Sequence, residues 1–353
     1  MNAAAPIPVT VLTGYLGAGK TTLLNRILSE DHGRRYAVIV NEFGEIGIDN
    51  ELILNTDEEL FEINTGCICC TVRGDLIRTL HGLLARLAAD AGAGLGAPFD
   101  AIVIETSGLA DPGPVAQTFF VDHVLQARTR LDSITTVVDA RHVLLRLADS
   151  REAVEQIAFA DQIVLNKTDL GSEAELQAIE ARLRRINLLA SIHRARRADV
   201  ALDQVLGRGG FALDRIVALE PGFLAPAHGE AGHVHDAHCG HEHGHDHGPH
   251  DHVHDGGIRS VSLSSRAAMD RDKVSRWLED LVAANGRDIL RAKGIIDVKD
   301  EPLRLVFQSV HMLLEGELQR GWRDGEARSS RLVFIGRHLD AQALARGFEA
   351  CAA

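Results

Sequence analysis

Residues 7–28 read IPVTVLTGYLGAGKTTLLNRIL, a short apolar run that leads into a glycine-rich stretch. From Gly14 to Thr21 the sequence matches G-x-x-x-x-G-K-[ST] between a predicted strand and a predicted helix, which is the context that a phosphate-binding loop requires. Glycines there let backbone N–H groups approach phosphates, Lys20 can reach the β and γ phosphates, and Thr21 can offer its hydroxyl to Mg²⁺. We therefore predict a nucleotide site with Lys20 and Thr21 as catalytic residues. The predicted nucleotide-binding residues of this stretch are Gly14, Gly17, Gly19, Lys20, Thr21 and Thr22. The alternative is a glycine-rich turn without a ligand.

Strands and helices continue to alternate after this loop. Near-continuous apolar strands between helices predict an α/β fold with a mostly parallel sheet that is covered on both faces. Phosphate chemistry then belongs at the carboxyl ends of the strands. Glu105 ends the strand in AIVIET and is expected to position the water shell of Mg²⁺ as a third catalytic residue, while Gly108 lets the backbone approach the γ phosphate. The expected strands cover residues 35–43, 99–106, 131–140 and 160–169, and the expected helices cover 72–89 and 172–187.

The motif NKTD at residues 166–169 completes the predicted strand QIVLN and indicates the base. An aspartate in the base plane accepts hydrogen bonds from N1–H and the exocyclic amine of guanine, whereas adenine presents an acceptor at N1. Asp169 therefore predicts GTP. Asn166 is expected at the other edge of the purine, and the stem of Lys167 is expected to cover its face. A solvated polar loop is the alternative.

Charge and hydropathy exclude several classes of partner. The chain has 353 residues, and 37 basic against 50 acidic side chains leave a formal charge of -13. Such a surface argues against nucleic acid or an anionic membrane as the main partner. The first residues lack the basic start and long apolar stretch of a signal peptide, and no later stretch is apolar enough to cross a bilayer. A cytoplasmic location is expected.

Residues 66–70 read GCICC, which places three of the five cysteines within four positions. A reducing cytosol disfavours structural disulfides, so clustered thiols point to metal binding or redox chemistry. Cys67, Cys69 and Cys70 are candidate thiolate ligands for Zn²⁺ or a similar ion, although a closed tetrahedral site needs a fourth donor. A plain structural zinc site and a redox-sensing pair at Cys69 and Cys70 remain the alternatives.

Residues 228–254 hold eleven of the eighteen histidines, together with glycine and acidic residues. This composition predicts a flexible linker. Because neutral imidazoles suit zinc, nickel and cobalt, we expect a weak, multisite metal store, to which Cys239 is a further candidate donor. A disordered spacer is the alternative. The candidate ligands in this tract include His233, His235, His241, His243, His245 and His247.

The remaining residues predict a small α+β domain with helices on one face of a sheet. Strands are expected at 258–265, 294–298, 303–313 and 331–336, and helices at 270–285 and from about Asp340. His311 is expected to be a core or interface histidine rather than a ligand, and Cys351 an ordinary helix residue. The chain then divides into a nucleotide-binding domain at 1–220, a histidine-rich linker at 221–257 and a second domain at 258–353, which we assign to client recognition or regulation.

In this order and context, the phosphate loop, NEFGEIGID at 41–49, GCICC, ETSGLADP at 105–112 and NKTD resemble the CobW family of P-loop GTPases. RAKGIIDV and LVFIGRHLD look like the family's second domain, so the resemblance covers nearly the whole chain. It implies GTP-dependent delivery of zinc or cobalt to an apo-metalloprotein client. It also implies that Glu42 joins the three cysteines as a metal ligand, with Asp49 a weaker candidate.

The expected activity is GTP hydrolysis to GDP and phosphate, and it should be slow. Leu109 follows Gly108 where Ras-like GTPases carry a glutamine that orients the attacking water. A nucleotide-dependent loop beside a bound ion would couple GTP state to metal affinity. Two other functions stay open, namely a metal storage or homeostasis regulator and a dedicated activator of one metalloenzyme. The chain is also a candidate homo-oligomer.

Overall fold

The computed structural model describes residues 5–30, 33–40, 59–62, 71–92, 99–211, 257–322 and 326–353. Several residues singled out in the sequence lie outside these ranges. They are Glu42, Asp49, Cys67, Cys69, Cys70, Cys239 and the histidines of residues 228–254.

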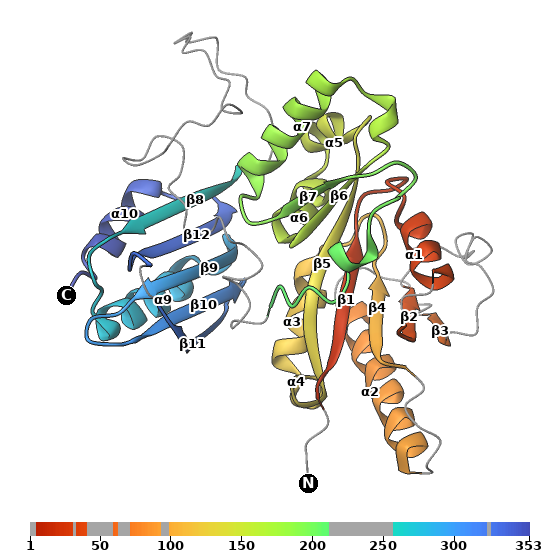
Figure 1. Ribbon diagram of the computed structural model, residues 1–353, viewed down its shortest axis with the longest axis horizontal. Helices are drawn as coiled ribbons and strands as arrows, with labels where there is room; N and C mark the ends of the chain where they lie inside the picture. Colours follow the sequence, from red (N-terminus) through yellow and green to blue (C-terminus); the bar gives the residue numbers. More distant parts are fainter. Residues whose placement is uncertain are drawn as a thin grey trace.

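The first part of the chain is built on a seven-stranded sheet with the strand order β3-β2-β4-β1-β5-β6-β7 (Figure 1). All neighbouring strands in it run parallel, so the predicted parallel α/β fold is confirmed. The strands are β1 (Ile7–Thr13), β2 (Tyr36–Val40), β3 (Glu59–Glu62), β4 (Ala101–Glu105), β5 (Thr129–Asp139), β6 (Gln162–Asn166) and β7 (Ser191–Arg194). Because the strands are parallel, the segments that follow them all leave from one edge of the sheet.

Helices cover both faces of this sheet. They are α1 (Lys20–Ser29), α2 (Thr71–Gly92), α3 (Pro112–Val121), α4 (His123–Arg128), α5 (Val143–Asp149), α6 (Arg151–Phe159) and α7 (Glu173–Ile186), with short 3₁₀ turns η2 (Thr168–Leu170) and η3 (Leu202–Gln204). Strand residues alternate between the two faces, as a pleated strand requires. In β4, Ile102 and Ile104 join the core beneath α2, α3 and α6, whereas Val103 joins the core beneath α1. Because helices cover both faces, residues that point to either side are buried, and the strands therefore read as continuous apolar runs in the sequence.

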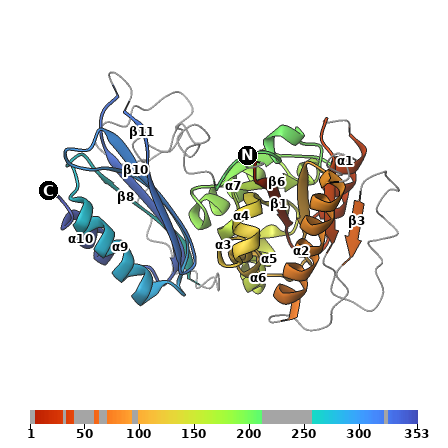
Figure 2. The ribbon, with the colours of Figure 1, turned by 90° about the horizontal axis from the view of Figure 1, so that it is seen from below.

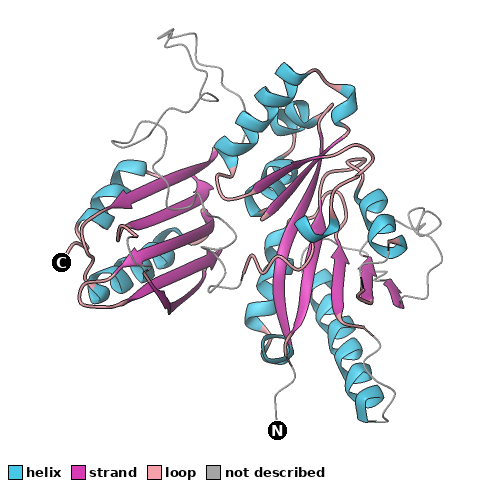
Figure 3. Ribbon diagram, viewed as in Figure 1, coloured by secondary structure: helices cyan, strands magenta, loops and turns pink. Residues whose placement is uncertain are grey.

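The second sheet is antiparallel and five-stranded, with the order β11-β10-β9-β12-β8 (Figure 1). Its strands are the group of magenta arrows beside the C-terminus in Figure 3. Its strands are β8 (Ile258–Ser265), β9 (Ile289–Asp297), β10 (Leu303–Val310), β11 (Leu313–Gly321) and β12 (Ser330–Arg337), and its helices are α9 (Arg271–Asn285) and α10 (Ala341–Glu349). Both helices pack on one face of the sheet, which confirms the predicted α+β arrangement. The helix starts agree with the sequence because Asp270 and Asp340 cap α9 and α10 with side-chain hydrogen bonds.

Three details of this domain differ from the sequence prediction. The strand expected at 294–298 is longer, because β9 already begins at Ile289. The single strand expected at 303–313 is wrong, since the chain turns at His311, whose φ is 51°, and returns as β11. Cys351 was expected in a helix, but α10 ends at Glu349 and the buried thiol follows it. Its Sγ donates to the carbonyl oxygen of Gly347, and burial raises the pKa of this thiol.

The other face of the second sheet packs against the first domain (Figure 2). There the fully buried Arg291 and Lys293 of β9 both contact the carboxylate of Asp161, and Arg291 also donates to the carbonyl oxygen of Phe159 at 2.6 Å. Burial acts to raise the pKa of Asp161, but the two neighbouring cations hold it below its ordinary value. Replacing one member of a buried charge cluster typically costs about 3–5 kcal/mol, so these contacts constrain how the domains sit together.

Candidate nucleotide site

The turn between β1 and α1 has the backbone shape of a phosphate-binding loop. Gly14, Gly17 and Gly19 all have positive φ values, of 141°, 72° and 108°. A Cβ atom on Gly14 would lie 2.2 Å from the carbonyl oxygen of Val137, so β5 leaves no room for a side chain there. Gly19 is the N-cap of α1, and the first N–H groups of that helix therefore lie at the end of the loop, where anions bind.

The predicted catalytic side chains meet at this turn. The Nζ atom of Lys20 donates to the carbonyl oxygen of Gly14 at 2.9 Å, which folds the lysine back over the loop. The hydroxyl of Thr21 donates to Oε1 of Glu105 at 3.4 Å, because β4 lies beside β1 and ends at Glu105. Glu105 is only 4% exposed, whereas Thr22 is exposed. The hydroxyl and carboxylate oxygens of Thr21 and Glu105 are hard donors of the kind that Mg²⁺ prefers.

The NKTD segment is tied to the phosphate loop. Asn166 is 2% exposed, its amide nitrogen donates to the carbonyl oxygen of Ala18 at 2.9 Å, and its amide oxygen accepts from the N–H of Ala198 at 2.8 Å. The ammonium of Lys167 donates to the carbonyl oxygen of Gly17 at 2.8 Å. The motif therefore joins the predicted phosphate site to the predicted base site, while the contacts of Asn166 and Lys167 with a purine stay predictions.

Asp139 supports this arrangement and was not among the residues predicted from the sequence. Its carboxylate accepts hydrogen bonds from Lys167 at 2.8 Å and from the backbone N–H of Arg141 at 2.8 Å, and lies 3.0 Å from the His142 ring. Partial burial acts to raise the pKa of Asp139, but the hydrogen bonds from Lys167 and His142 lower it overall. The ionised carboxylate holds the lysine stem in place. Asp139 could have been found from the sequence because it ends a predicted strand, β5, which lies beside β6 and its NKTD motif.

Asp169 lies in η2 and is exposed, as a carboxylate that meets a base from solvent must be. The neighbouring Thr168 donates both its N–H and its hydroxyl to the carbonyl oxygen of Ala195. On the other side, Arg26 of α1 donates to the carbonyl oxygens of Ala198 and Val200. Residues 195–200 after β7 are thus a second loop beside NKTD, which the sequence analysis missed because it contains no motif.

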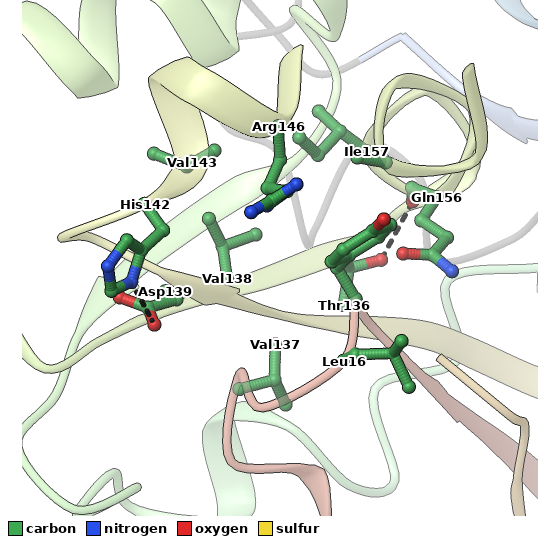
Figure 4. Close-up of a pocket in the computed structure, with 12 residues that line it drawn as sticks. Leu16, Thr136, Val137, Val138, Asp139, His142, Val143, Arg146, Gln156 and Ile157 are labelled. Atoms are coloured by element: carbon green, nitrogen blue, oxygen red, sulfur yellow. Dashed lines mark hydrogen bonds and ion pairs between the residues drawn. The ribbon is translucent and has the colours of Figure 1, made fainter. Parts of the chain in front are cut away.

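A pocket of about 390 Å³ adjoins the phosphate loop on the side of α5 and α6 (Figure 4). Tyr15 and Leu16 of the loop form one wall, and the end of β5 forms another. Arg146 of α5 points into the pocket, with its guanidinium carbon 5.5 Å from the centre of the Tyr15 ring. The remaining lining residues are Thr136, Val137, Val138, Asp139, His142, Val143, Ala153, Gln156 and Ile157.

The predicted transition-metal ligands cannot be placed, because Glu42, the three cysteines of GCICC and the histidine-rich tract lie outside the described residues. Within the described ranges, no group of three or more His, Cys, Asp or Glu side chains could hold a metal ion. In the same part of the chain, none of the helices is both long and apolar enough to cross a bilayer.

A parallel sheet with a phosphate loop after β1, an acidic residue at the end of β4 and NKTD at the end of β6 defines a P-loop GTPase. Comparison with known proteins gives the family. Residues 8–194 match the CobW/HypB/UreG nucleotide-binding domain, and residues 258–352 match the cobalamin synthesis protein CobW C-terminal domain. The chain therefore belongs to the CobW family, and the resemblance seen in the sequence is confirmed.

Individual relatives match over almost their full length. The chain is 37% identical to the zinc chaperone YjiA of Escherichia coli, over 97% of this chain and 98% of YjiA. It is 33% identical to the zinc chaperone CobW of a Sinorhizobium species, over 94% and 93% of the two chains. The crystal structure of the Zn(II)-bound YjiA GTPase from E. coli superimposes with a TM-score of 0.73, at 32% identity and 99% coverage of both chains.

Proposed function

We propose that this protein is a GTP-dependent metallochaperone that carries zinc, or a similar ion such as cobalt, and delivers it to an apo-metalloprotein client. Its nucleotide-binding domain is a GTPase of the CobW family, and the relatives that match its whole length are named as zinc chaperones. Zinc is the cargo in this proposal, and GTP hydrolysis times its release.

One observation carries the proposal, namely the position of strand ends at one edge of the sheet. β2 ends at Val40 and β3 at Glu62, and both run parallel to β4, which ends at Glu105 beside Thr21. The sequence that holds Glu42 follows β2, and the sequence that holds the three cysteines follows β3. β2 and β3 therefore both end at the edge of the sheet where the phosphate loop lies, which supports a link between nucleotide state and metal affinity.

The described residues support distinct roles in hydrolysis. Lys20 and the first N–H groups of α1 would bind the phosphates, and Thr21 with Glu105 would hold Mg²⁺, which neutralises the charge that develops on the phosphate oxygens. Asn166 and Asp169 would select guanine, and the stem of Lys167 would cover the face of the base. Leu109 follows Gly108 and supplies no polar group to orient water, so intrinsic turnover should be slow.

The deciding experiment measures zinc and cobalt affinity with competing chelators, once with a nonhydrolysable GTP analogue and once with GDP. Linkage requires that the metal change the ratio of the two nucleotide affinities by the same factor. We expect the two forms to differ by roughly five- to 150-fold, which is the usual range of coupling. The same measurement on Cys67/Cys69/Cys70→Ser should lose one tight site, and deletion of residues 228–254 should remove only weakly held ions.

Transfer of one ion to an apo-metalloprotein on GTP addition then separates a chaperone from a storage protein. Equal affinities of the GTP and GDP forms for both metals would defeat the switch mechanism and leave a GTPase that only contains a metal site.

A further inference from the structure

Gln156 of α6 clamps the loop that follows β4. Its side-chain amide nitrogen donates to the carbonyl oxygens of Gly108 at 3.0 Å and of Ala110 at 3.1 Å. Gln156 is 1% exposed, and its hydrogen bond to Gly108 is buried, whereas the one to Ala110 is partly buried. The contact with Gly108 joins residues 48 positions apart in the sequence. Neither Gln156 nor α6 carries a motif that predicts this contact.

The two ends of this loop are fixed by other contacts. At its start, Thr106 donates its N–H to the carbonyl oxygen of Leu12 at 2.9 Å, and its hydroxyl donates to the hydroxyl oxygen of Thr13 at 2.9 Å. At its end, Asp111 caps α3 by accepting from the N–H of Gly113 at 2.8 Å. Between these ends, the N–H of Ala110 donates to the carbonyl oxygen of Ser107 at 3.1 Å, and Gln156 adds a contact from outside the loop to the carbonyls of Gly108 and Ala110, so this glutamine helps to fix the conformation of Gly108.

Gly108 itself lies against the phosphate loop. A Cβ atom on it would lie 2.8 Å from the backbone nitrogen of Leu16, which shows how closely the two backbones approach. A small rotation of the loop about its fixed ends would therefore change the distance between Gly108 and the phosphate loop. Losing this amide would also leave the carbonyl of the buried Gly108 without this partner, at a typical cost of about 1–3 kcal/mol, and would remove the partner of the half-buried Ala110 carbonyl, so the loop is expected to rearrange.

We propose that Gln156 is a positioning residue for GTP hydrolysis, which keeps the backbone of Gly108 at the place of the γ phosphate. The inference rests on the proposed roles of Gly108 and of the phosphate loop. Gln156 does not act as the water-orienting glutamine of Ras-like GTPases, because its amide nitrogen is engaged by the two carbonyls. It acts on the reaction only through the loop.

The test compares Gln156→Met with wild type in the full-length chain. Methionine keeps the length of the side chain and removes both donors, and Gln156→Glu places a carboxylate against the same carbonyls as a second variant. Gln162→Met is the matched control, because Gln162 is also buried but begins β6 at the opposite edge of the sheet. The measurements are kcat and KM for GTP, the affinities for GDP and for a nonhydrolysable GTP analogue, and the melting temperature.

We expect Gln156→Met to lower kcat by about ten- to 100-fold, as misplaced groups in active sites typically do. Affinity for the GTP analogue should fall, while GDP affinity stays within about twofold because GDP lacks the γ phosphate. Unchanged kcat in folded Gln156→Met, or an equal loss of GDP and analogue affinity, would overturn the inference. If Gln156→Met does not fold, the same outcomes are read from Gln156→Glu, and failure of both to fold would show a purely structural role. Absence of GTP hydrolysis by the wild type would instead remove the proposed function itself.

Discussion

Asp169 carries the expected choice of base, and its substitution tests that choice. Asp169→Asn replaces an acceptor that pairs with the two donors of guanine by an amide that matches neither base fully. We expect the preference for GTP over ATP to shrink by about five- to 150-fold, which corresponds to the ~1–3 kcal/mol of an unmet buried polar contact. Calorimetry with both nucleotides would measure it.

Asp203 offers a matched control for Asp169. Asp203 is likewise the central, exposed residue of a 3₁₀ turn, η3. Asp203→Asn should leave the preference unchanged. A loss of equal size in both variants would mean that net charge, and not pairing with the base, sets the preference.

A substitution at Gly14 tests the backbone conformation of the phosphate loop. Gly14→Ala would bring a methyl group 2.2 Å from the carbonyl oxygen of Val137, in addition to the strain of a positive φ. Gly33 also has positive φ, of 67°, but a Cβ there meets open space. Gly33→Ala should therefore cost about 1–2 kcal/mol of unfolding free energy, and Gly14→Ala about 1–3 kcal/mol more. Chemical denaturation without nucleotide measures the difference, and equal costs would contradict the predicted clash.

At the scale of elements, α6 is the helix that joins the loop after β4 to the second sheet. Glu155, next to Gln156, is 4% exposed and pairs with Arg337 of β12 and with Arg151. Phe159 at the end of the same helix accepts from Arg291 of β9, and its ring centre lies 5.0 Å from that of His311. Contacts from the second domain thus fix α6, and Gln156 of α6 in turn contacts the loop after β4.

Arg337→Met tests whether the contact between the second domain and α6 affects GTP hydrolysis. The substitution removes one partner of a buried carboxylate, so we expect the melting temperature to fall, by the equivalent of about 1–3 kcal/mol, and kcat for GTP to fall with it. Arg328→Met is the control, because Arg328 pairs with the buried Asp297 inside the second domain. It should lower the melting temperature without changing kcat. An equal effect of both variants on kcat would show that the contact between Arg337 and α6 has no specific influence on GTP hydrolysis.

The strand error at 303–313 also belongs to this scale. LRLVFQSVHMLLEGELQRG contains no proline and no asparagine, and its first glycine, Gly316, comes after the turn, so nothing local marks the turn at His311. The left-handed conformation of His311 is instead imposed by contacts. Its N–H donates to the carbonyl oxygen of Leu290, and its ring packs on Phe159 of the other domain.

At the scale of the whole molecule, the interface between the domains should respond to pH through His311. Burial, followed by the charge of Arg337, lowers the pKa of His311 below its ordinary value, while Glu155 acts in the opposite direction. The folded state therefore favours neutral imidazole. Its contribution to stability is complete above the unfolded pKa of about 6.5 and is lost as pH falls through the lower folded value.

We expect the free energy of unfolding to decrease between pH 7.5 and 5.5, and His311→Asn to make this decrease smaller, since asparagine tolerates positive φ and does not titrate there. Denaturant titrations at several pH values measure the slopes. His338→Asn is the control, because His338 is exposed and has a φ of 50°. A slope that His311→Asn leaves unchanged would assign the pH dependence to other groups.

The sequence by itself determined the features that short stretches encode. The phosphate loop needs eight consecutive residues from Gly14 to Thr21, NKTD needs four, and the buried parallel strands show as apolar runs, so the fold class and the family followed from local patterns. These patterns also marked Lys20, Thr21 and Glu105, which the structure brings to one edge of the sheet.

Only the tertiary structure decided which side chains hold these motifs together. Asn166 reaches Ala18 across 148 positions, Gln156 reaches Gly108 across 48, and Arg337 reaches Glu155 across 182. A buried amide or guanidinium acts through the partner that it meets after folding, and such partners share no spacing in the sequence. The supporting contacts of the site and the packing of the second domain on α6 therefore could not be predicted from local patterns, because long-range hydrogen bonds and burial create them.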